Sequence, residues 1–256
     1  MLLSHRIVVC TCLEILLLGV TGFAGDLPTL PSGITDVDLS FGLWDGRFED
    51  EIFDNADTLE FAVFGGSAFN TTVPTALGTL PNLEFLYISD CFLSGDLSYM
   101  EPMPKIREHW IDVNPGFGGP IFEFIGNIST LQSFSVTQSS LTGTVPAVLA
   151  DLVQMQQMWF TNNLLTGTIP SELGLLQAMS RLQLEGNSFV GSMPEEICDN
   201  IGFLKPLQIL GADCEDENFE VRMTLHSKTL LCRQPYIFLT SFSPFLCSIV
   251  FLLHML

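Results

Sequence analysis

The sequence repeats itself with a period of 24 residues. Three series keep this spacing: Leu141, Leu165 and Phe189; Gly143, Gly167 and Gly191; and Pro146, Pro170 and Pro194. Steps of the same length backwards from Leu141 reach Phe117, Leu93 and Phe69. A fixed period in this range is typical of a solenoid, so each period is expected to form one turn that stacks on its neighbours.

Each period also contains a short segment with apolar residues at its first, fourth and sixth places. This spacing predicts a strand whose alternate side chains enter a shared core. One segment, which has His109 at an inward place, begins one residue earlier than the 24-residue period requires. An extra residue in 114–117 brings the next repeat back to the period. The pattern occurs eight times, at 34–39, 59–64, 83–88, 106–111, 131–136, 155–160, 179–184 and 204–209.

These repeats resemble the plant-type 24-residue subclass of the leucine-rich repeat family, L-x-x-L-x-L-x-x-N-x-L-x-G-x-[IV]-P. The resemblance covers about residues 34–214 and is strongest over 141–198. It implies an α/β leucine-rich repeat solenoid, which is a curved right-handed superhelix with a parallel β-sheet on its concave face. The repeat domain is expected over 25–220, with about seven or eight repeats and a C-terminal cap at 195–220.

The resemblance also implies roles for polar residues at the turns. In the family, an Asn side chain bonds backbone groups of adjacent turns, and Asn163 and Asn187 are expected to do this here. Ser139 and Cys91 take the same place in other turns, where they are expected to do so less well or not at all. The repeated Gly permits positive φ, whereas the repeated Pro fixes φ and removes a backbone donor.

An open stack needs capped ends, because its last turn otherwise exposes the core to water. C-terminal caps of this family commonly hold a pair of cysteines as a disulfide, so Cys198 and Cys214 are predicted to form one. Two buried free thiols are the alternative. Upstream, Cys10 and Cys12 are the only cysteines before the repeats, and the N-terminal side is expected to be capped by 26–33.

The charge of the chain is concentrated in its middle. Residues 26–220 hold 28 acidic and 5 basic side chains, 5 − 28 = −23, against a formal net charge of −20 for the whole chain. Such a surface repels phosphate backbones, so nucleic acid is not an expected partner. Cationic or neutral polar partners stay open.

Both ends of the chain are apolar. Residues 1–24 are predicted to be a secretory signal peptide, because Arg6 precedes an apolar run from Ile7 to Val20 and small residues precede a cleavage point after Ala24. The alternative is an N-terminal strand or helix of the folded domain.

The C-terminal tail, 221–256, contains an apolar segment at 235–256 without Asp, Glu, Lys or Arg. This length suits a membrane span, although Lys228 and Arg233 lie before the segment and not after it. A cleaved lipid-anchor signal and a stretch that is not native coding sequence are the alternatives. A secreted or cell-surface protein is predicted, membrane-anchored if the tail is native.

Two sequons, Asn70-Thr71-Thr72 and Asn127-Ile128-Ser129, predict glycosylation at Asn70 and Asn127. Both lie in the turn and convex parts of their repeats, so glycans there leave the strand face open.

Function in a repeat sheet is expected on the outward side chains of its strands, which stand in columns. Aromatic residues are dense in these columns, and exposed aromatic side chains on a rigid surface are common anchors for peptides and sugars. Alternatively, some of them fill gaps under a loop. The candidate contact residues are Phe61, Phe85, Tyr87, Trp110, Trp159 and Arg181.

An enzyme is not predicted. His109 takes an inward place and suits a core residue better than a general base, the acidic clusters lack the ligand spacing of a calcium loop, and no kinase signature is present. No catalytic residue, metal or cofactor is expected. The predicted function is an extracellular, receptor-like module that binds a protein, peptide or glycan on its concave face, with a membrane co-receptor as a further partner. A secreted hydrolase inhibitor and a structural wall or coat protein are the alternatives.

Overall fold

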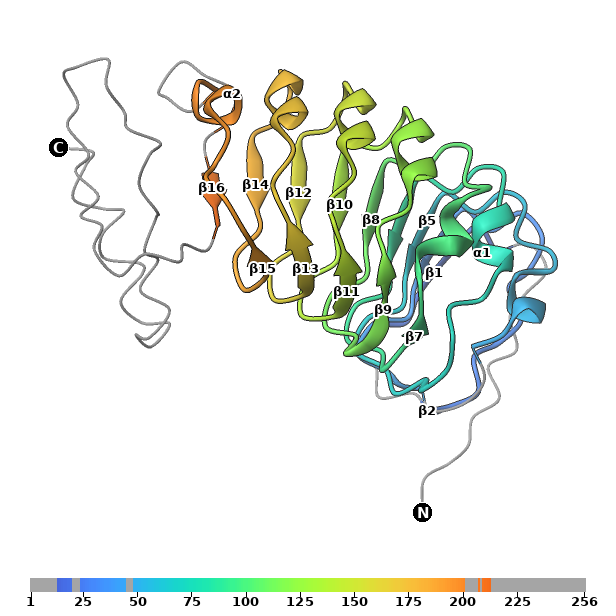
Figure 1. Ribbon diagram of the computed structural model, residues 1–256. Coiled ribbons are helices and arrows are strands. Elements are labelled where there is room, and N and C mark those ends of the chain that lie inside the picture. The colour runs from blue at the N-terminus through green and yellow to red at the C-terminus, as the bar shows by residue number, and fades with distance from the viewer. Residues whose placement is uncertain (1–12, 20–23, 45–47, 201–206, 208, 213–256) are drawn as a thin grey trace, which may run out of the picture.

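The computed structural model describes residues 13–19, 24–44, 48–200, 207 and 209–212. Its main element is a parallel sheet in which strands follow one another in chain order, one strand for each turn of the solenoid (Figure 1). The nine strands are β1 (Ile15–Leu17), β3 (Asp36–Asp38), β5 (Phe61–Val63), β6 (Phe85–Tyr87), β8 (Glu108–Trp110), β10 (Ser133–Ser135), β12 (Gln157–Trp159), β14 (Arg181–Gln183) and β16 (Ile209–Gly211).

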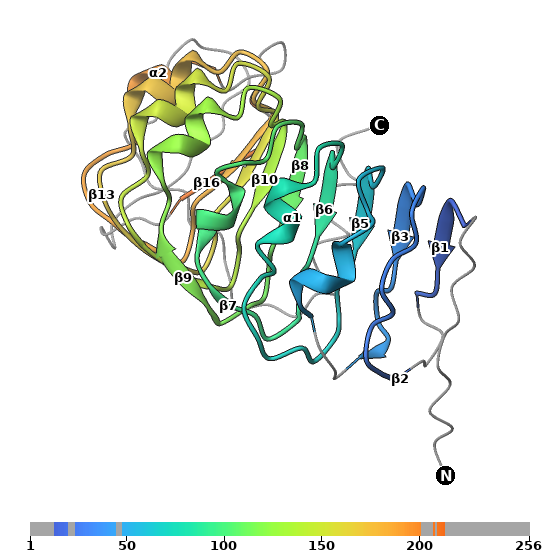
Figure 2. The same cartoon turned by 90° about the vertical axis from the view of Figure 1, so that its right-hand side faces the viewer.

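Shorter elements complete each turn (Figure 2). A five-stranded parallel sheet contains β7 (Ser94–Gly95), β9 (Gly116–Pro120), β11 (Ser140–Gly143), β13 (Leu164–Gly167) and β15 (Ser188–Phe189), and β2 (Ala24–Gly25) pairs with β4 (Leu43–Trp44). The helices are η1 (Asp50–Phe53), α1 (Ala76–Thr79), η2 (Leu97–Met100), η3 (Glu123–Asn127), η4 (Ala147–Asp151), η5 (Ser171–Leu175) and α2 (Glu195–Cys198). The predicted α/β solenoid with stacked parallel strands is confirmed.

The core forms from the apolar places of the repeat. In one turn, Leu131, Phe134 and Val136 are all fully buried, and the residues between them face outward. Each such side chain contributes about 1.5–3 kcal/mol relative to an exposed one, but only when the neighbouring turns cover it. His109 occupies an inward place in the same way and is also fully buried, as the sequence predicted.

The predicted Asn ladder is present. The Asn163 side-chain oxygen accepts from Leu141 N at 3.0 Å, and its nitrogen donates to Val136 O at 2.6 Å in the preceding turn. Asn187 repeats both bonds one turn later, accepting from Leu165 N at 3.1 Å. The ladder ties adjacent turns together where the main strands end.

Two further residues join the ladder. Asn114 accepts from Cys91 N at 3.1 Å and from Leu93 N at 3.0 Å, and donates to Ile88 O at 3.0 Å. The Cys91 thiol donates to Phe64 O at 3.0 Å, so it supplies the donor half of the Asn role, more than the sequence suggested. Burial raises the pKa of this thiol to about 12, so it keeps its proton at neutral pH.

The N-terminal region contains a strand, β1, within the predicted signal peptide. β1 pairs in parallel with β3, and Leu18 N donates to Asp38 O at 2.7 Å. Leu13, Leu16 and Leu18 have the same one-four-six spacing as the later strands, and Gly25 and Pro28 keep the Gly and Pro phase. The alternative, an N-terminal strand, is thus compatible with the fold, and cleavage after Ala24 would remove this strand. The signal peptide stays a prediction.

Substitutions in β1 separate these two alternatives. If β1 belongs to the folded domain, Leu16→Asp is expected to lower the free energy of unfolding by about 2–4 kcal/mol, because it places a charge at a side chain that is 8% exposed. Leu17→Asp, at a side chain 63% exposed, is the control and should change it by less than about 0.5 kcal/mol. Urea unfolding of the purified protein measures both, and equal stability of the two variants would favour a cleaved leader.

Other predictions concern the chain ends and the sequons. Cys198 ends α2, but Cys214 and the apolar segment 235–256 lie outside the described residues. Within the part of the chain that the structure describes, no helix has the length and apolar character needed to cross a bilayer. Asn70 and Asn127 are both exposed, and their glycosylation stays a prediction.

Candidate functional site

The strand register aligns the outward side chains in two columns. In one column, Phe61 and Phe85 stand side by side and are followed by Glu108. The other column holds Tyr87 beside Trp110. Since the register is continuous from β3 to β14, residues distant in sequence form one surface on the concave face.

Five of the six predicted contact residues form an unbroken row of aromatic rings. The ring centroids of Phe61 lie 6.0 Å from Phe85 and 5.7 Å from Tyr87. Tyr87 lies 4.8 Å from Trp110, and Trp110 lies 5.8 Å from Trp159 in an edge-to-face arrangement. All five side chains are partly exposed, so the row is a surface and not part of the core.

The row crosses β10 because this strand presents two serines outward. Ser133 and Ser135 are buried although they point to the concave side. The Trp110 indole donates to Ser133 Oγ at 2.9 Å, which fixes its ring over the strand and in contact with Trp159. Larger side chains at these places would separate the two tryptophans.

Two carboxylates flank Trp110. Glu108 Oε2 accepts from the Tyr87 hydroxyl at 2.8 Å, and burial, followed by this carboxylate, raises the pKa of Tyr87 well above its usual value. Asp112 Oδ1 accepts from Ser135 Oγ at 2.6 Å and from Thr137 N at 2.7 Å. The hydrogen bonds hold both acids beside the aromatic row.

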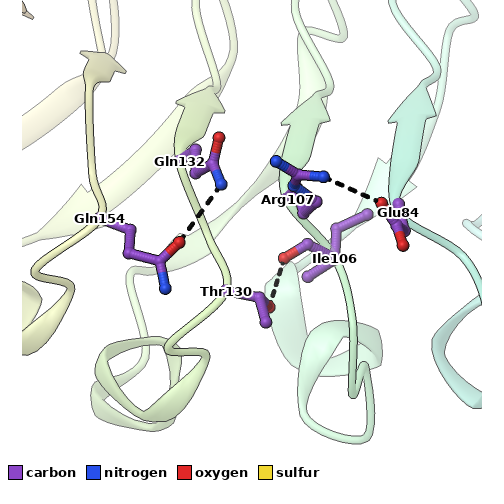
Figure 3. A network of polar contacts seen from close by, with 6 residues as sticks. All are labelled: Glu84, Ile106, Arg107, Thr130, Gln132 and Gln154. Carbon is purple, nitrogen blue, oxygen red and sulfur yellow. Dashed lines mark hydrogen bonds and ion pairs between the residues drawn. The ribbon is translucent and has the colours of Figure 1, made fainter.

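A polar network borders the row where the strands begin (Figure 3). Arg107 lies 3.3 Å from Glu84 Oε2 and 5.9 Å above the Phe85 ring. Thr130 Oγ1 donates to Ile106 O at 2.7 Å, which joins adjacent turns. Arg107 is thus already paired with a carboxylate and an aromatic ring of its own chain.

The sixth predicted contact residue is separate. Arg181 lies on β14 beside Gln157 of β12, in the column that contains Phe61. It is exposed, and Gln157 and Ser133 stand between it and Glu108. The sequence placed it on the correct face, but not within the aromatic row.

The buried His109 is not positioned as a general base. Its Nε2 is hydrogen-bonded to the hydroxyl of Tyr99, whose side chain is also buried. Burial lowers the pKa of His109 to about 3. In the described residues, no three His, Cys, Asp or Glu side chains gather in a way that could hold a metal ion.

A hollow of about 480 Å³ lies on the other side of the solenoid, between η1, α1 and the turn after η2. Its acidic residues include Asp50, which accepts from Ala76 N at 2.8 Å and from Thr75 Oγ1 at 3.0 Å. These bonds join two successive turns, so Asp50 has a packing role there.

Comparison with solved structures decides the fold. No protein-family model and no curated protein matches the sequence. The plant peptide hormone receptor RGFR1 in complex with RGF2 matches with a TM-score of 0.62 and 24% identity, over 75% of this chain and 34% of that one. The chain therefore has a leucine-rich repeat fold.

Two further solved structures share this leucine-rich repeat fold. The ectodomain of the Arabidopsis thaliana receptor kinase GASSHO1/SCHENGEN3, in complex with CASPARIAN STRIP INTEGRITY FACTOR 2, matches at a TM-score of 0.63 and 23% identity, over 79% of this chain and 27% of that one. The Arabidopsis receptor kinase HAESA, in complex with the peptide hormone IDA and the co-receptor SERK1, matches at a TM-score of 0.60 and 22% identity. This match covers 82% of this chain and 40% of that one. The present chain thus spans less than half of each.

Sequence patterns did not reveal one other feature of this leucine-rich repeat surface. Phe41, Phe92 and Val113 follow the main strands with φ of 53°, 53° and 57°, a left-handed conformation that is unfavourable for bulky residues. Phe41 is 65% exposed, and its ring covers Gly66, where a Cβ would meet a ring carbon at 2.6 Å. The edge of the concave sheet therefore carries exposed apolar side chains.

Proposed function

We propose that the chain is an extracellular leucine-rich repeat module that binds a protein or peptide ligand on its concave face. The observation that supports this most is the row of partly exposed aromatic rings from Phe61 to Trp159. A hydrogen bond from the Trp110 indole to Ser133 fixes the ring at the centre of this row. Aromatic side chains fixed on a rigid sheet lose little entropy on binding, which suits them as anchors.

The dimensions of the row suit an extended peptide. Adjacent strands lie about 4.8 Å apart, so the four steps from β5 to β12 span about 19 Å. An extended chain rises about 3.3 Å per residue, so about five or six residues cover this length. The three similar solved structures are described as complexes with RGF2, CASPARIAN STRIP INTEGRITY FACTOR 2 and IDA, which agrees with a peptide ligand for this face.

Location and further partners belong to the same proposal. A secreted or cell-surface position is consistent with the exposed sequons at Asn70 and Asn127, which lie away from the strand face. A co-receptor is a further proposed partner, because the HAESA structure contains SERK1 beside its peptide hormone.

Panning of a random heptapeptide library on the full chain tests the proposal. The double variant Trp110→Ala/Trp159→Ala is expected to bind the selected peptides at least about tenfold more weakly, because it removes the centre of the row. Val153→Ala/Leu175→Ala is the matched control, since these apolar residues are 71% and 68% exposed and lie on or next to the helices η4 and η5.

The control should bind as the wild type does. Isothermal titration with synthetic peptides measures both affinities, and thermal unfolding checks that the variants fold. Equal affinity of the wild type and the tryptophan variant, or selection of no peptide at all, would overturn the proposal. Binding of oligosaccharides that depends on both tryptophans would replace the peptide by a glycan ligand.

A further inference from the structure

We infer that the concave face recognises a cationic side chain of its peptide ligand, an arginine in preference to a lysine, at Trp110 between Glu108 and Asp112. This inference rests on the proposed function and specifies its ligand class. It follows from three features of the same surface: an aromatic ring, two carboxylates that flank it, and the lack of an ion pair to either carboxylate among the described residues.

The sequence of β8 places the three groups together. Glu108 and Trp110 are two residues apart and face outward, while His109 and Ile111 between and beyond them are fully buried. Side chains two residues apart in a strand begin about 6.6 Å from each other, close enough for both to contact one guanidinium group. Asp112 follows at the same interval, and its bond to Ser135 keeps it on the concave side.

Each carboxylate has one oxygen that accepts from the protein and one that is available. Glu108 uses Oε2 for the Tyr87 hydroxyl, and Asp112 uses Oδ1 for Ser135 and Thr137. Among the described residues, neither Glu108 nor Asp112 forms an ion pair or has a bond to its second oxygen. Both are partly exposed, so a ligand can reach them.

Arg107, the nearest cation in sequence, is engaged elsewhere. Its guanidinium pairs with Glu84 (Figure 3). It also lies over the Phe85 ring, 5.9 Å from the centroid. In this contact a guanidinium lies against a carboxylate and an aromatic ring. We propose the same combination for the arginine of the ligand, one strand away. Arg181 lies beyond β10 and β12.

The chemistry of the site favours arginine. A cation within about 6 Å of a Trp face is attracted by the ring, and partial removal of water strengthens this attraction. A planar guanidinium can stack on the indole and donate to carboxylates at its edge, whereas an ammonium acts as a point charge. A negative repeat zone, with 5 − 28 = −23 charges over 26–220, also attracts a cationic peptide from a distance.

The heptapeptides selected on the full chain provide the test. They should be enriched in arginine relative to the unselected library, and replacement of the arginine by glutamine should weaken binding at least about tenfold in low salt. Replacement by lysine should weaken it less. The difference between arginine and glutamine peptides should shrink at high salt, since screening weakens the charge contribution.

Two protein variants assign the effect to the site. Glu108→Gln/Asp112→Asn keeps the acceptors for Tyr87 and Ser135 but removes both charges, so it should reduce the preference for arginine to less than about threefold. Asp151→Asn/Glu172→Gln is the matched control, because it makes the same charge change at exposed residues of η4 and η5. The control should keep the tenfold preference.

The outcomes separate the two proposals. Selected peptides without arginine enrichment, or with equal affinity after the change to glutamine, overturn this inference while the tryptophan dependence preserves the proposed function. An arginine preference that Glu108→Gln/Asp112→Asn leaves intact also overturns it, because the charge then lies elsewhere. Loss of the tryptophan dependence overturns both.

Discussion

Asn114→Ala is expected to lower the free energy of unfolding by about 3–5 kcal/mol. The Asn114 side chain is fully buried; its oxygen accepts from two backbone N–H groups, and its two N–H groups are shared among three backbone carbonyls within 3.3 Å. Alanine leaves these groups buried without their partner, and each such group costs about 1–3 kcal/mol unless a neighbour replaces the lost bond. The loss is large because it acts on two adjacent turns.

Asn82→Ala is the control for this prediction. Asn82 also bonds a backbone carbonyl of the preceding turn, Asp57 O at 2.7 Å, but it does so at the exposed surface. Water can replace that bond, so the expected change is below about 1 kcal/mol. Urea unfolding followed by circular dichroism measures both variants. Equal losses would show that the Asn114 bonds do not hold the turns together.

Acidification is expected to destabilise the protein through His109. The folded state lowers the pKa of this imidazole to about 3, because burial disfavours its charged form. Below the unfolded pKa of about 6.5, the unfolded chain binds a proton that the folded chain does not. Stability from this group is therefore complete only well above pH 6.5, and between pH 6.5 and pH 4.5 it falls by about 2 kcal/mol.

The double variant His109→Leu/Tyr99→Phe isolates this contribution. Leucine suits the inward place, which Leu86 and Phe134 occupy in the adjacent strands, and Tyr99→Phe removes the hydroxyl that would lose its partner. The free energy of unfolding, measured with urea, should fall by about 2 kcal/mol more in the wild type than in the variant between pH 6.5 and pH 4.5. The same decrease in both proteins would contradict the assignment to His109.

Much of the fold was predictable because the repeat is encoded locally. The one-four-six spacing located the seven strands from β3 to β14, and the phase of Gly143 and Gly167 matched their φ of 78°. The last pattern, 204–209, was placed three residues early, because β16 begins at Ile209 and Leu210 pairs with Leu182. The spacing also explains why His109 is buried. A motif of this kind works because each turn packs only on its neighbours, so a short window contains most of the relevant contacts.

The strand β1 lies where the sequence leaves two interpretations open. Leu13, Leu16 and Leu18 follow the repeat pattern, but the apolar run around them also fits a leader peptide. Local hydropathy does not distinguish a run that is cleaved from one that packs. The pairing of Leu16 with Val37 joins residues in two different turns, and local hydropathy does not contain this information.

The candidate site was predictable as a set of columns but not as a surface. Counting along the repeats placed Phe61, Tyr87, Trp110 and Trp159 on the outward face. It did not show that the Trp110 and Trp159 rings are in contact across β10. This contact depends on the small side chains of Ser133 and Ser135, and only the strand register places these serines between the two tryptophans.

The sequence by itself determined the architecture, because periodic apolar residues, glycines and an amide ladder define one turn and the turns repeat. It also determined which side chains face outward. Only the tertiary structure decided which of them touch: that Arg107 pairs with Glu84, that Glu108 holds Tyr87, and that Asp112 keeps a free oxygen beside Trp110. These contacts join side chains of adjacent turns. They depend on side-chain size and on hydrogen bonding between the turns, which the 24-residue period does not specify.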